Sequence, residues 1–216
     1  MPGTTQEARG QLEPINQETN ESRRMFDDFC RSLGPEEFAA GVPQSTWTVK
    51  DYIAHLATID IYVGDRLAHA VEGKRWQPKG EDGGPFNLDT WNEARIVERK
   101  SKTIEELLTE AAERREQLWA TVDRFTPELL GQEFNFRDNP ITYLGYFRLW
   151  PRHDAVHTAD MLRAIPERKE EPALKKWLAR YGFQSAVPGP PGASERVPLV
   201  GSIRSPLFRP WRRLEL

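Results

Sequence analysis

Apolar residues recur at spacings of three and four along most of the chain, a pattern typical of amphipathic helices. The first such stretch covers residues 15–33 and includes Phe26 and Phe29. It follows a polar stretch over residues 1–14, which we expect to be a flexible leader. Gly34-Pro35 ends the helix, because neither residue favours a helix interior. The pattern thus predicts a leader and then a first helix.

A second helix is predicted from Thr48 to about Val71. Thr48 and Asp51 have the spacing of a capping box, with Asp in place of the usual Glu or Gln. The residues that follow, 73–88, contain four Gly and two Pro, a composition typical of a loop. We expect this loop to be mobile and to stay within the same domain, because the helices on its two sides need each other to bury their apolar faces.

The third helical stretch covers residues 89–125 and is long and strongly charged, with residues 101–103 as a candidate position for a break or a new cap. A fourth helix is predicted over residues 143–165, with Pro140 favoured at its start. Pro151 lies inside this stretch. Because proline removes one backbone hydrogen bond and clashes with the preceding turn, we expect a kink near Phe147.

Four amphipathic helices without strand alternation predict an all-α fold, a four-helix bundle over residues 15–166. Residues 167–216 are expected to form a short fifth helix at 172–181 and an extended, Pro-rich tail. The end of this tail, residues 208–213, mixes aromatic and basic side chains. It is expected either to pack over the bundle or a partner subunit, or to remain solvated.

The composition excludes several classes of protein. The chain has 216 residues, of which 33 are acidic and 30 basic, so its formal net charge is −3. A general nucleic-acid-binding protein would carry a clear basic excess. No stretch approaches the roughly 18 apolar residues of a membrane span, and residues 1–13 lack the apolar segment of a secretory signal. We expect a cytoplasmic protein that binds neither nucleic acid nor membrane.

The number of cysteines excludes two kinds of cysteine site. Cys30 is the only cysteine of the chain, so an intramolecular disulfide and a Cys-rich zinc site are excluded. A lone cysteine in a helical apolar stretch behaves as a small hydrophobic residue. We therefore expect Cys30 to be buried.

The histidines carry the main chemical signal. His153 and His157 are spaced i, i+4, which places both imidazoles on one face of a helix and allows both to bind one metal ion. A third ligand has to come from another helix, and His55 and His69 are the candidates. The two are 14 positions apart, which corresponds to roughly 21 Å of helix, so only one of them can join the pair. We expect His69 to lie on the surface.

Other interpretations of the pair remain open at this point. Histidines at this spacing also occur on solvated helix faces, or in protein cores where they form hydrogen bonds with other groups. A zinc-protease helix of the His-Glu-x-x-His type fits poorly. Asp154 stands where that motif has its Glu, and no histidine follows His157.

The residues from Trp47 to Leu56, Trp-Thr-Val-Lys-Asp-Tyr-Ile-Ala-His-Leu, resemble the start of the second helix in the DinB-like superfamily. This superfamily includes the N-terminal domains of mycothiol-dependent maleylpyruvate isomerases and the bacillithiol transferases. Its second landmark, a His-x-x-x-His in the fourth helix, is matched by His153 and His157. Trp91-Asn-Glu and the capped helix after it are similar to the third helix of the family. The resemblance covers residues 15–166.

The resemblance implies a bundle that holds a divalent metal (zinc, nickel, iron or manganese) through His55, His153 and His157. In the isomerase branch a carboxylate tends to stand where this chain has His153, so the all-histidine set is closer to the broader DinB-like and thiol-transferase branches. Homodimers are compatible with bundles of this family, although no segment of the sequence marks an interface.

Three neutral histidines leave a metal with its full positive charge and open positions, which suits binding of a thiolate or activation of water. The expected function is transfer of a low-molecular-weight thiol to a small-molecule substrate, or hydrolysis of one. The alternatives are a non-catalytic protein that sequesters a ligand, and a structural bundle whose histidines never meet.

Further side chains are candidates for the surroundings of the metal. The candidates for a substrate pocket are Tyr146, Arg148, Trp150 and Arg152. The candidates for groups that support the site are Asp51, Asp160 and Tyr62. Helix capping is the simpler role for Asp51, while orientation of a histidine and a purely structural role are equally open for Asp160. Arginines at such positions are more often on the surface, and Trp150 and Trp47 are more often part of the core.

Overall fold

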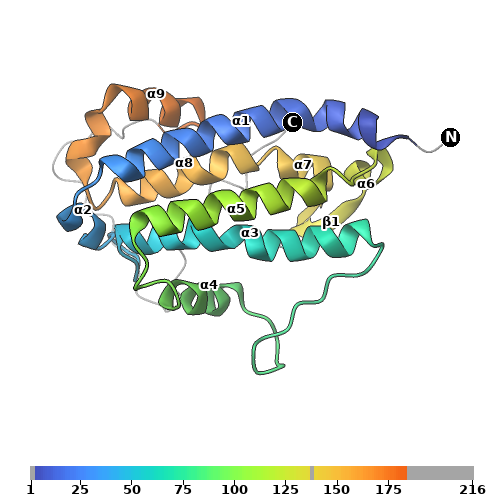
Figure 1. The fold of residues 1–216 in the computed structure, drawn as a ribbon, viewed down its shortest axis with the longest axis horizontal. Helices are drawn as coiled ribbons and strands as arrows, with labels where there is room; N and C mark the ends of the chain where they lie inside the picture. Colours follow the sequence, from blue (N-terminus) through green and yellow to red (C-terminus); the bar gives the residue numbers. More distant parts are fainter. Residues whose placement is uncertain (1–2, 137–138, 184–216) are drawn as a thin grey trace, which may run out of the picture.

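Four long helical segments lie side by side and form the body of the molecule (Figure 1). The computed structural model describes residues 3–136 and 139–183. The four segments are α1 (Thr5–Ser32), α3 (Val49–Val71), α5 (Ile104–Val122) and the consecutive pair α7 (Tyr143–Phe147) and α8 (Trp150–Met161). α1 packs mainly against α8, and α3 mainly against α5. The predicted all-α bundle is confirmed.

The first helix begins earlier than predicted. α1 starts at Thr5, where a capping box joins Thr4 and Glu7: each side chain accepts a hydrogen bond from the backbone N–H of the other residue. Ala8 and Leu12 continue the buried face of the helix. The expectation of a flexible leader over residues 1–14 is therefore wrong from Thr5 onward.

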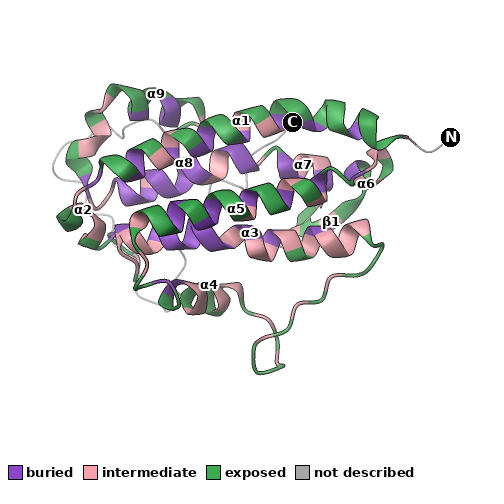
Figure 2. Ribbon diagram, in the orientation of Figure 1, coloured by how far each residue is buried: buried purple, intermediate pink, exposed green. Residues whose placement is uncertain are grey.

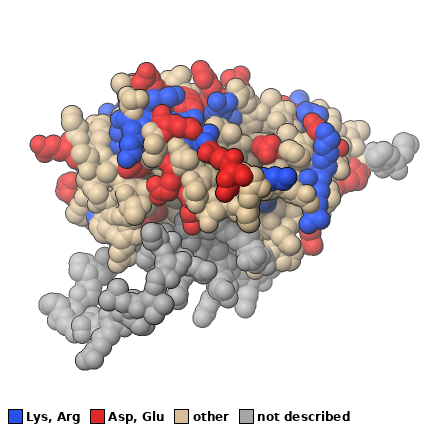
Figure 3. Space-filling model, turned by 90° about the horizontal axis from the view of Figure 1, so that it is seen from below, with Lys and Arg blue, Asp and Glu red and all other residues tan. Residues whose placement is uncertain are grey.

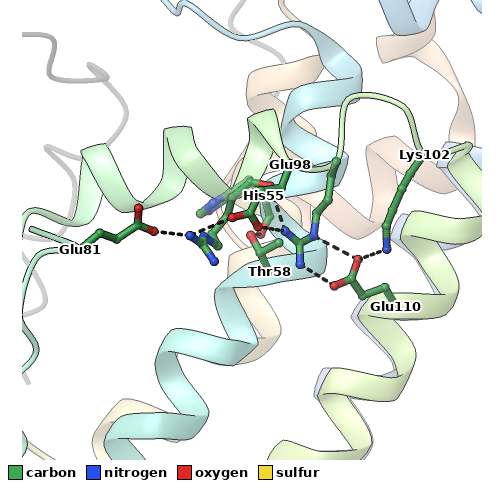
Figure 4. A network of polar contacts seen from close by, with 8 residues as sticks. His55, Thr58, Glu81, Glu98, Lys102 and Glu110 are labelled. Atoms are coloured by element: carbon green, nitrogen blue, oxygen red, sulfur yellow. Dashed lines mark hydrogen bonds and ion pairs between the residues drawn. The ribbon is translucent and has the colours of Figure 1, made fainter.

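The long third stretch is two helices, α4 (Leu88–Val97) and α5. The new cap expected at residues 101–103 is confirmed. The Thr103 hydroxyl accepts a hydrogen bond from the Glu106 backbone N–H at 3.2 Å, and the Glu106 carboxylate accepts from the Thr103 N–H at 2.6 Å. A small network beside this cap ties the α4–α5 connection to α5, because the Glu110 carboxylate accepts hydrogen bonds from Arg99 and Lys102 (Figure 4).

Two short strands precede the last helices of the bundle, where no strand was expected. β1 (Glu133–Phe136) and β2 (Asn139–Thr142) pair in antiparallel fashion, with Asn135 opposite Pro140. Pro140 therefore lies in a strand and does not start a helix. Thr142 caps α7 instead, by accepting a hydrogen bond from the Gly145 backbone N–H at 3.0 Å.

The predicted kink is a complete break, at residues 148–149 between α7 and α8. Pro151 lies in the first turn of α8, where its missing N–H leaves no hydrogen bond unmade and its ring does not meet a continuous preceding turn. α8 ends at Met161, four residues before the predicted end.

Shorter helices complete the described part of the chain. α9 (Pro172–Arg180) confirms the predicted fifth helix. The connections contain α2 (Pro35–Ala39), α6 (Pro127–Gly131) and the 3₁₀ helix η1 (Pro166–Glu170), which the periodicity did not predict. The loop after α3 runs to Asn87, the N-cap of α4. The tail expected over residues 183–216 lies outside the described residues, apart from Phe183.

The buried residues lie mainly on the sides of the helices that face one another, and the exposed ones on the outside (Figure 2). The buried apolar residues form two clusters. Along α3, Ala57 belongs to one cluster and Val63 to the other, and the buried Thr58 and Asp60 lie between them. In α1, α5 and α8 too, buried polar residues lie between members of the two clusters. The bundle thus has a buried polar layer between two apolar clusters.

Candidate metal centre

The structure brings three of the four histidines together at this polar layer. His55 comes from α3, and His153 and His157 come from adjacent turns of α8. The ring centroids are 5.9 Å apart for His55 and His153, 5.0 Å for His55 and His157, and 4.7 Å for His153 and His157. One nitrogen of each ring lies within 4.8 Å of one nitrogen of each of the others.

The three nitrogens fit the requirements of one divalent transition metal. Two imidazole nitrogens that share an ion at about 2.0–2.1 Å are at most roughly 4.2 Å apart. The observed spread of 4.8 Å therefore needs only small rotations of the side chains. The donor set, three imidazoles without a carboxylate, suits zinc, nickel or iron.

The surroundings bury most of this group of rings and keep His153 neutral. His55 and His157 are buried, and His153 is partly exposed. Burial and the adjacent His157 and His55 rings hold the pKa of His153 well below its ordinary value. His153 is therefore neutral at neutral pH, the form in which imidazole binds a metal. The rings of Trp47 and Tyr52 border the group, at centroid distances of 5.2 Å from His55 and 5.5 Å from His157.

His69 does not join the three. It lies near the end of α3, with its Nδ1 at 2.8 Å from the backbone oxygen of Asp65. Its side chain is more than a third exposed. The choice between His55 and His69 as neighbour of the pair is thus decided in favour of His55.

The two candidate aspartates have different surroundings. Asp51 serves the capping box of α3: its carboxylate accepts hydrogen bonds from the Thr48 backbone N–H at 2.9 Å and from the Thr48 hydroxyl at 2.8 Å. Asp160 is 1% exposed, and its Oδ2 lies 3.4 Å from Nδ1 of His157. Of the two aspartates, Asp160 is therefore the one that lies beside a histidine of the group.

Two buried ion pairs lie beside the histidines. In the first, the Arg23 guanidinium of α1 donates to both carboxylate oxygens of Asp154 in α8, at 2.9 and 3.0 Å. In the second, the Arg115 guanidinium of α5 donates to both carboxylate oxygens of Asp60 in α3, at 2.5 and 3.4 Å. All four side chains are at least nine-tenths buried. Each of the four main helices therefore contributes one charge to the polar layer.

A cavity of about 100 Å³ lies against His153. Tyr62, Tyr146 and Trp150 line it, as do Phe136 of the hairpin and Leu88 at the start of α4. Asp60 and Arg115 also contribute to the cavity wall.

The other candidate pocket residues lie elsewhere. Arg148 is exposed, and the Arg152 guanidinium stacks over the ring of Phe183, 5.0 Å from its centroid. Burial lowers the pKa of Arg152. Neither arginine lines the cavity. The expectation that Cys30 is buried is confirmed, and burial raises the pKa of its thiol well above the ordinary value.

Asp60 and Arg115 were not among the residues singled out from the sequence, although a signal existed. Asp60 follows Leu56 by four residues and precedes Val63 by three, and Arg115 has the same relation to Ala111 and Leu118. Both charges therefore stand on the apolar faces of their helices. A charge at such a position is buried only when it is paired.

On the outside of the molecule, acidic and basic side chains are interspersed on the face shown in Figure 3. No helix of the described residues is long and apolar enough to cross a membrane.

Comparison with known proteins supplies the family. No curated protein sequence matches the chain significantly. The sequence pattern of the DinB superfamily matches residues 18–161, which include all of α3 and α8 and therefore the three histidines. Because this match extends over about two thirds of the chain and the fold is the expected helical bundle, the chain is a member of the DinB superfamily.

Proposed function

We propose that this protein is a metal-dependent enzyme that transfers a low-molecular-weight thiol to a small apolar substrate or hydrolyses such a substrate. His55, His153 and His157 would hold the metal, which is zinc, nickel, iron or manganese. The observation that carries the proposal is the position of His153, which belongs to the three-histidine group and also lines the cavity.

A divalent metal held by three neutral imidazoles supplies Lewis-acid polarisation and binds a thiol as its thiolate. The other tasks fall to side chains of the protein. Asp160 beside Nδ1 of His157 fixes the orientation of that ring. Tyr146 and Trp150, both more than nine-tenths buried, give the cavity beside His153 an apolar wall. Cys30 is fully buried, so the thiol of the reaction has to come from a cosubstrate.

The first experiment measures metal content by elemental analysis of tag-free protein purified without chelator. We expect about one equivalent of a transition metal in the wild-type protein and in His69→Ala, and its loss in His55→Ala and His153→Ala. His69→Ala is the matched control because His69 lies on the same helix as His55 but outside the group. Wild-type protein that carries no metal, and takes up none on addition of zinc, nickel, iron or manganese, would contradict the proposal.

The second experiment tests turnover. Mycothiol, bacillithiol, glutathione and cysteine are each incubated with a small apolar electrophile, and thiol consumption is followed with the metal-loaded protein and with His153→Ala. We expect turnover that depends on His153 with at least one thiol, or hydrolysis of an apolar ester. Stoichiometric ligand binding without either reaction would instead support a ligand-sequestering protein.

A further inference from the structure

The cavity beside His153 has a mainly apolar wall. Aromatic rings and aliphatic side chains form most of the lining, among them Tyr146, Trp150, Val63 and Leu149. The two charged residues of the lining, Asp60 and Arg115, are joined to each other by hydrogen bonds, so their charges compensate within the protein. The cavity therefore suits an uncharged, apolar group, because a charged group would lose its water and find no free counter-charge.

The volume of the cavity limits the size of that group. An engineered cavity of roughly 150 Å³ in another protein binds benzene, a ring of six carbon atoms. In proportion, the volume of about 100 Å³ beside His153 accommodates about four carbon atoms. A benzene ring is therefore too large for the cavity, whereas a propyl or butyl chain fits.

The same limits decide which of the two reactants the cavity can take. Mycothiol, bacillithiol and glutathione are much larger than a butyl chain, and they carry several hydroxyl, amide or carboxylate groups. Cysteine is smaller but bears two charges at neutral pH. Burial of such groups in an apolar wall is unfavourable. The cavity is therefore suited to the substrate and not to the thiol.

We infer that the cavity beside His153 binds an aliphatic group of about four carbon atoms, so that the substrates are short-chain aliphatic compounds and not aromatic ones. This inference rests on the proposed function, because it takes the occupant of the cavity to be the substrate of the three-histidine centre. His153 belongs to both the centre and the cavity wall. A chain that fills the cavity therefore has its attached functional group close to the centre.

The test uses the primary alcohols from ethanol to 1-hexanol, whose binding to the metal-loaded protein is measured by ligand-observed NMR titration. The hydroxyl group is the same in every member, so differences along the series report the alkyl chain. We expect the affinity to rise about fourfold with each methylene group up to 1-butanol, and to stop rising in 1-pentanol and 1-hexanol. Benzyl alcohol, whose ring exceeds the volume, is expected to bind more weakly than 1-butanol.

Variants of the lining test whether this cavity sets the limit. Leu149→Ala enlarges the cavity, so the rise is expected to continue to 1-hexanol. Leu144→Ala is the matched control, because Leu144 is partly buried against the same apolar cluster as Leu149 but does not line the cavity; it should leave the limit at 1-butanol. In Val63→Phe, which fills the cavity, no alcohol is expected to bind. Circular dichroism checks the fold of each variant, and Leu149→Ala keeps the test valid if Val63→Phe does not fold.

Four results would overturn the inference: no binding of any alcohol to the wild-type protein, a rise that continues evenly to 1-hexanol, tighter binding of benzyl alcohol than of 1-butanol, or an unchanged limit in Leu149→Ala. Metal content is measured on the same samples. Wild-type protein with one equivalent of metal and no limit in chain length would overturn the inference and leave the proposed function intact. A limit at 1-butanol in protein that binds no metal would overturn the proposed function and leave the size and class of the ligand intact.

Discussion

Arg23 of α1 holds Asp154 of α8 through two hydrogen bonds of 2.9 and 3.0 Å, and Asp154 is the residue directly after His153. The Asp154 side chain is completely buried, and that of Arg23 is 9% exposed. The pair therefore joins the first helix of the bundle to the helix that carries two of the three clustered histidines.

The contribution of the Arg23–Asp154 pair to stability can be measured by comparing the free energies of unfolding of single and double variants. Arg23→Met should lower the free energy of unfolding by about 3–5 kcal/mol, because it leaves the Asp154 carboxylate buried without its partner. Arg23→Met/Asp154→Leu should recover most of this loss. Urea unfolding followed by circular dichroism, on metal-free protein, measures both. Arg24→Met removes an exposed arginine of the same helix and serves as control; a loss equal to that of Arg23→Met would contradict the assignment.

Asp160 is expected to affect metal affinity. Asp160→Asn weakens the partner of His157 Nδ1, and loss of such a partner typically lowers metal affinity about 10–100-fold. Competition with a chromophoric chelator measures the change. Asp51→Asn is the matched control, since Asp51 caps α3: it should lower stability by about 1 kcal/mol or less and leave metal affinity unchanged. The same affinity in both variants would show that the contact with Asp160 is incidental.

The raised pKa of Asp27 leads us to expect that the free energy of unfolding depends on pH. Burial raises the pKa of its carboxyl from the ordinary 3.8 to about 6, so the folded protein binds this proton more tightly than the unfolded chain. The stability gained from this proton is complete below about pH 4 and is lost as the pH rises through about 6. Because the side chain is partly solvated, we expect Asp27→Asn to be more stable than the wild type by roughly 1–2 kcal/mol at pH 7.5.

This difference should nearly vanish at pH 4, where the wild-type carboxyl is protonated in the folded state. Urea unfolding at the two pH values measures it. Asp28→Asn changes the exposed neighbour and should have little effect at either pH. Equal stability of Asp27→Asn and the wild type at pH 7.5 would contradict the assigned pKa.

Cys30 should be inert in the folded protein. Its side chain has no exposed surface and its thiol has a raised pKa, so little thiolate forms and reagents reach it only through opening of the bundle. We expect labelling by a thiol-specific chromogenic reagent to be at least about a hundredfold slower in the native protein than in 8 M urea. Rapid labelling without denaturant would show that α1 opens locally, and Cys30 would then become a candidate nucleophile.

Much of the fold could be predicted from the sequence where local signals agreed with the packing. The capping box at Thr48 and the break or new cap expected at residues 101–103 marked the starts of α3 and α5 correctly, because helix caps depend on residues only a few positions apart. The start of α1 was missed because Ala8 and Leu12 alone carry its apolar face there. The hairpin was missed because each strand has four residues, too few to show an alternation, and because Pro140 suits an edge strand as well as a helix start.

The candidate site was predictable only in part, and for a similar reason. The spacing of His153 and His157 is a local property of one helix, and the structure places both beside His55. The partners of Asp60 and Arg115 could not be named, since their pairing depends on which helices become neighbours. Arg152 directly precedes His153 and Arg148 stands five residues before it, but neither arginine lines the cavity.

The buried polar layer also fixes the positions of the helices along their axes relative to one another. A shift of α8 by one turn would move Asp154 by about 5.4 Å, beyond the reach of the Arg23 guanidinium, and would leave two buried charges apart. Apolar side chains would tolerate such a slip far better, because one methyl group can replace another. The Arg23–Asp154 pair thus selects one axial register of α8, and in that register His153 and His157 lie level with His55.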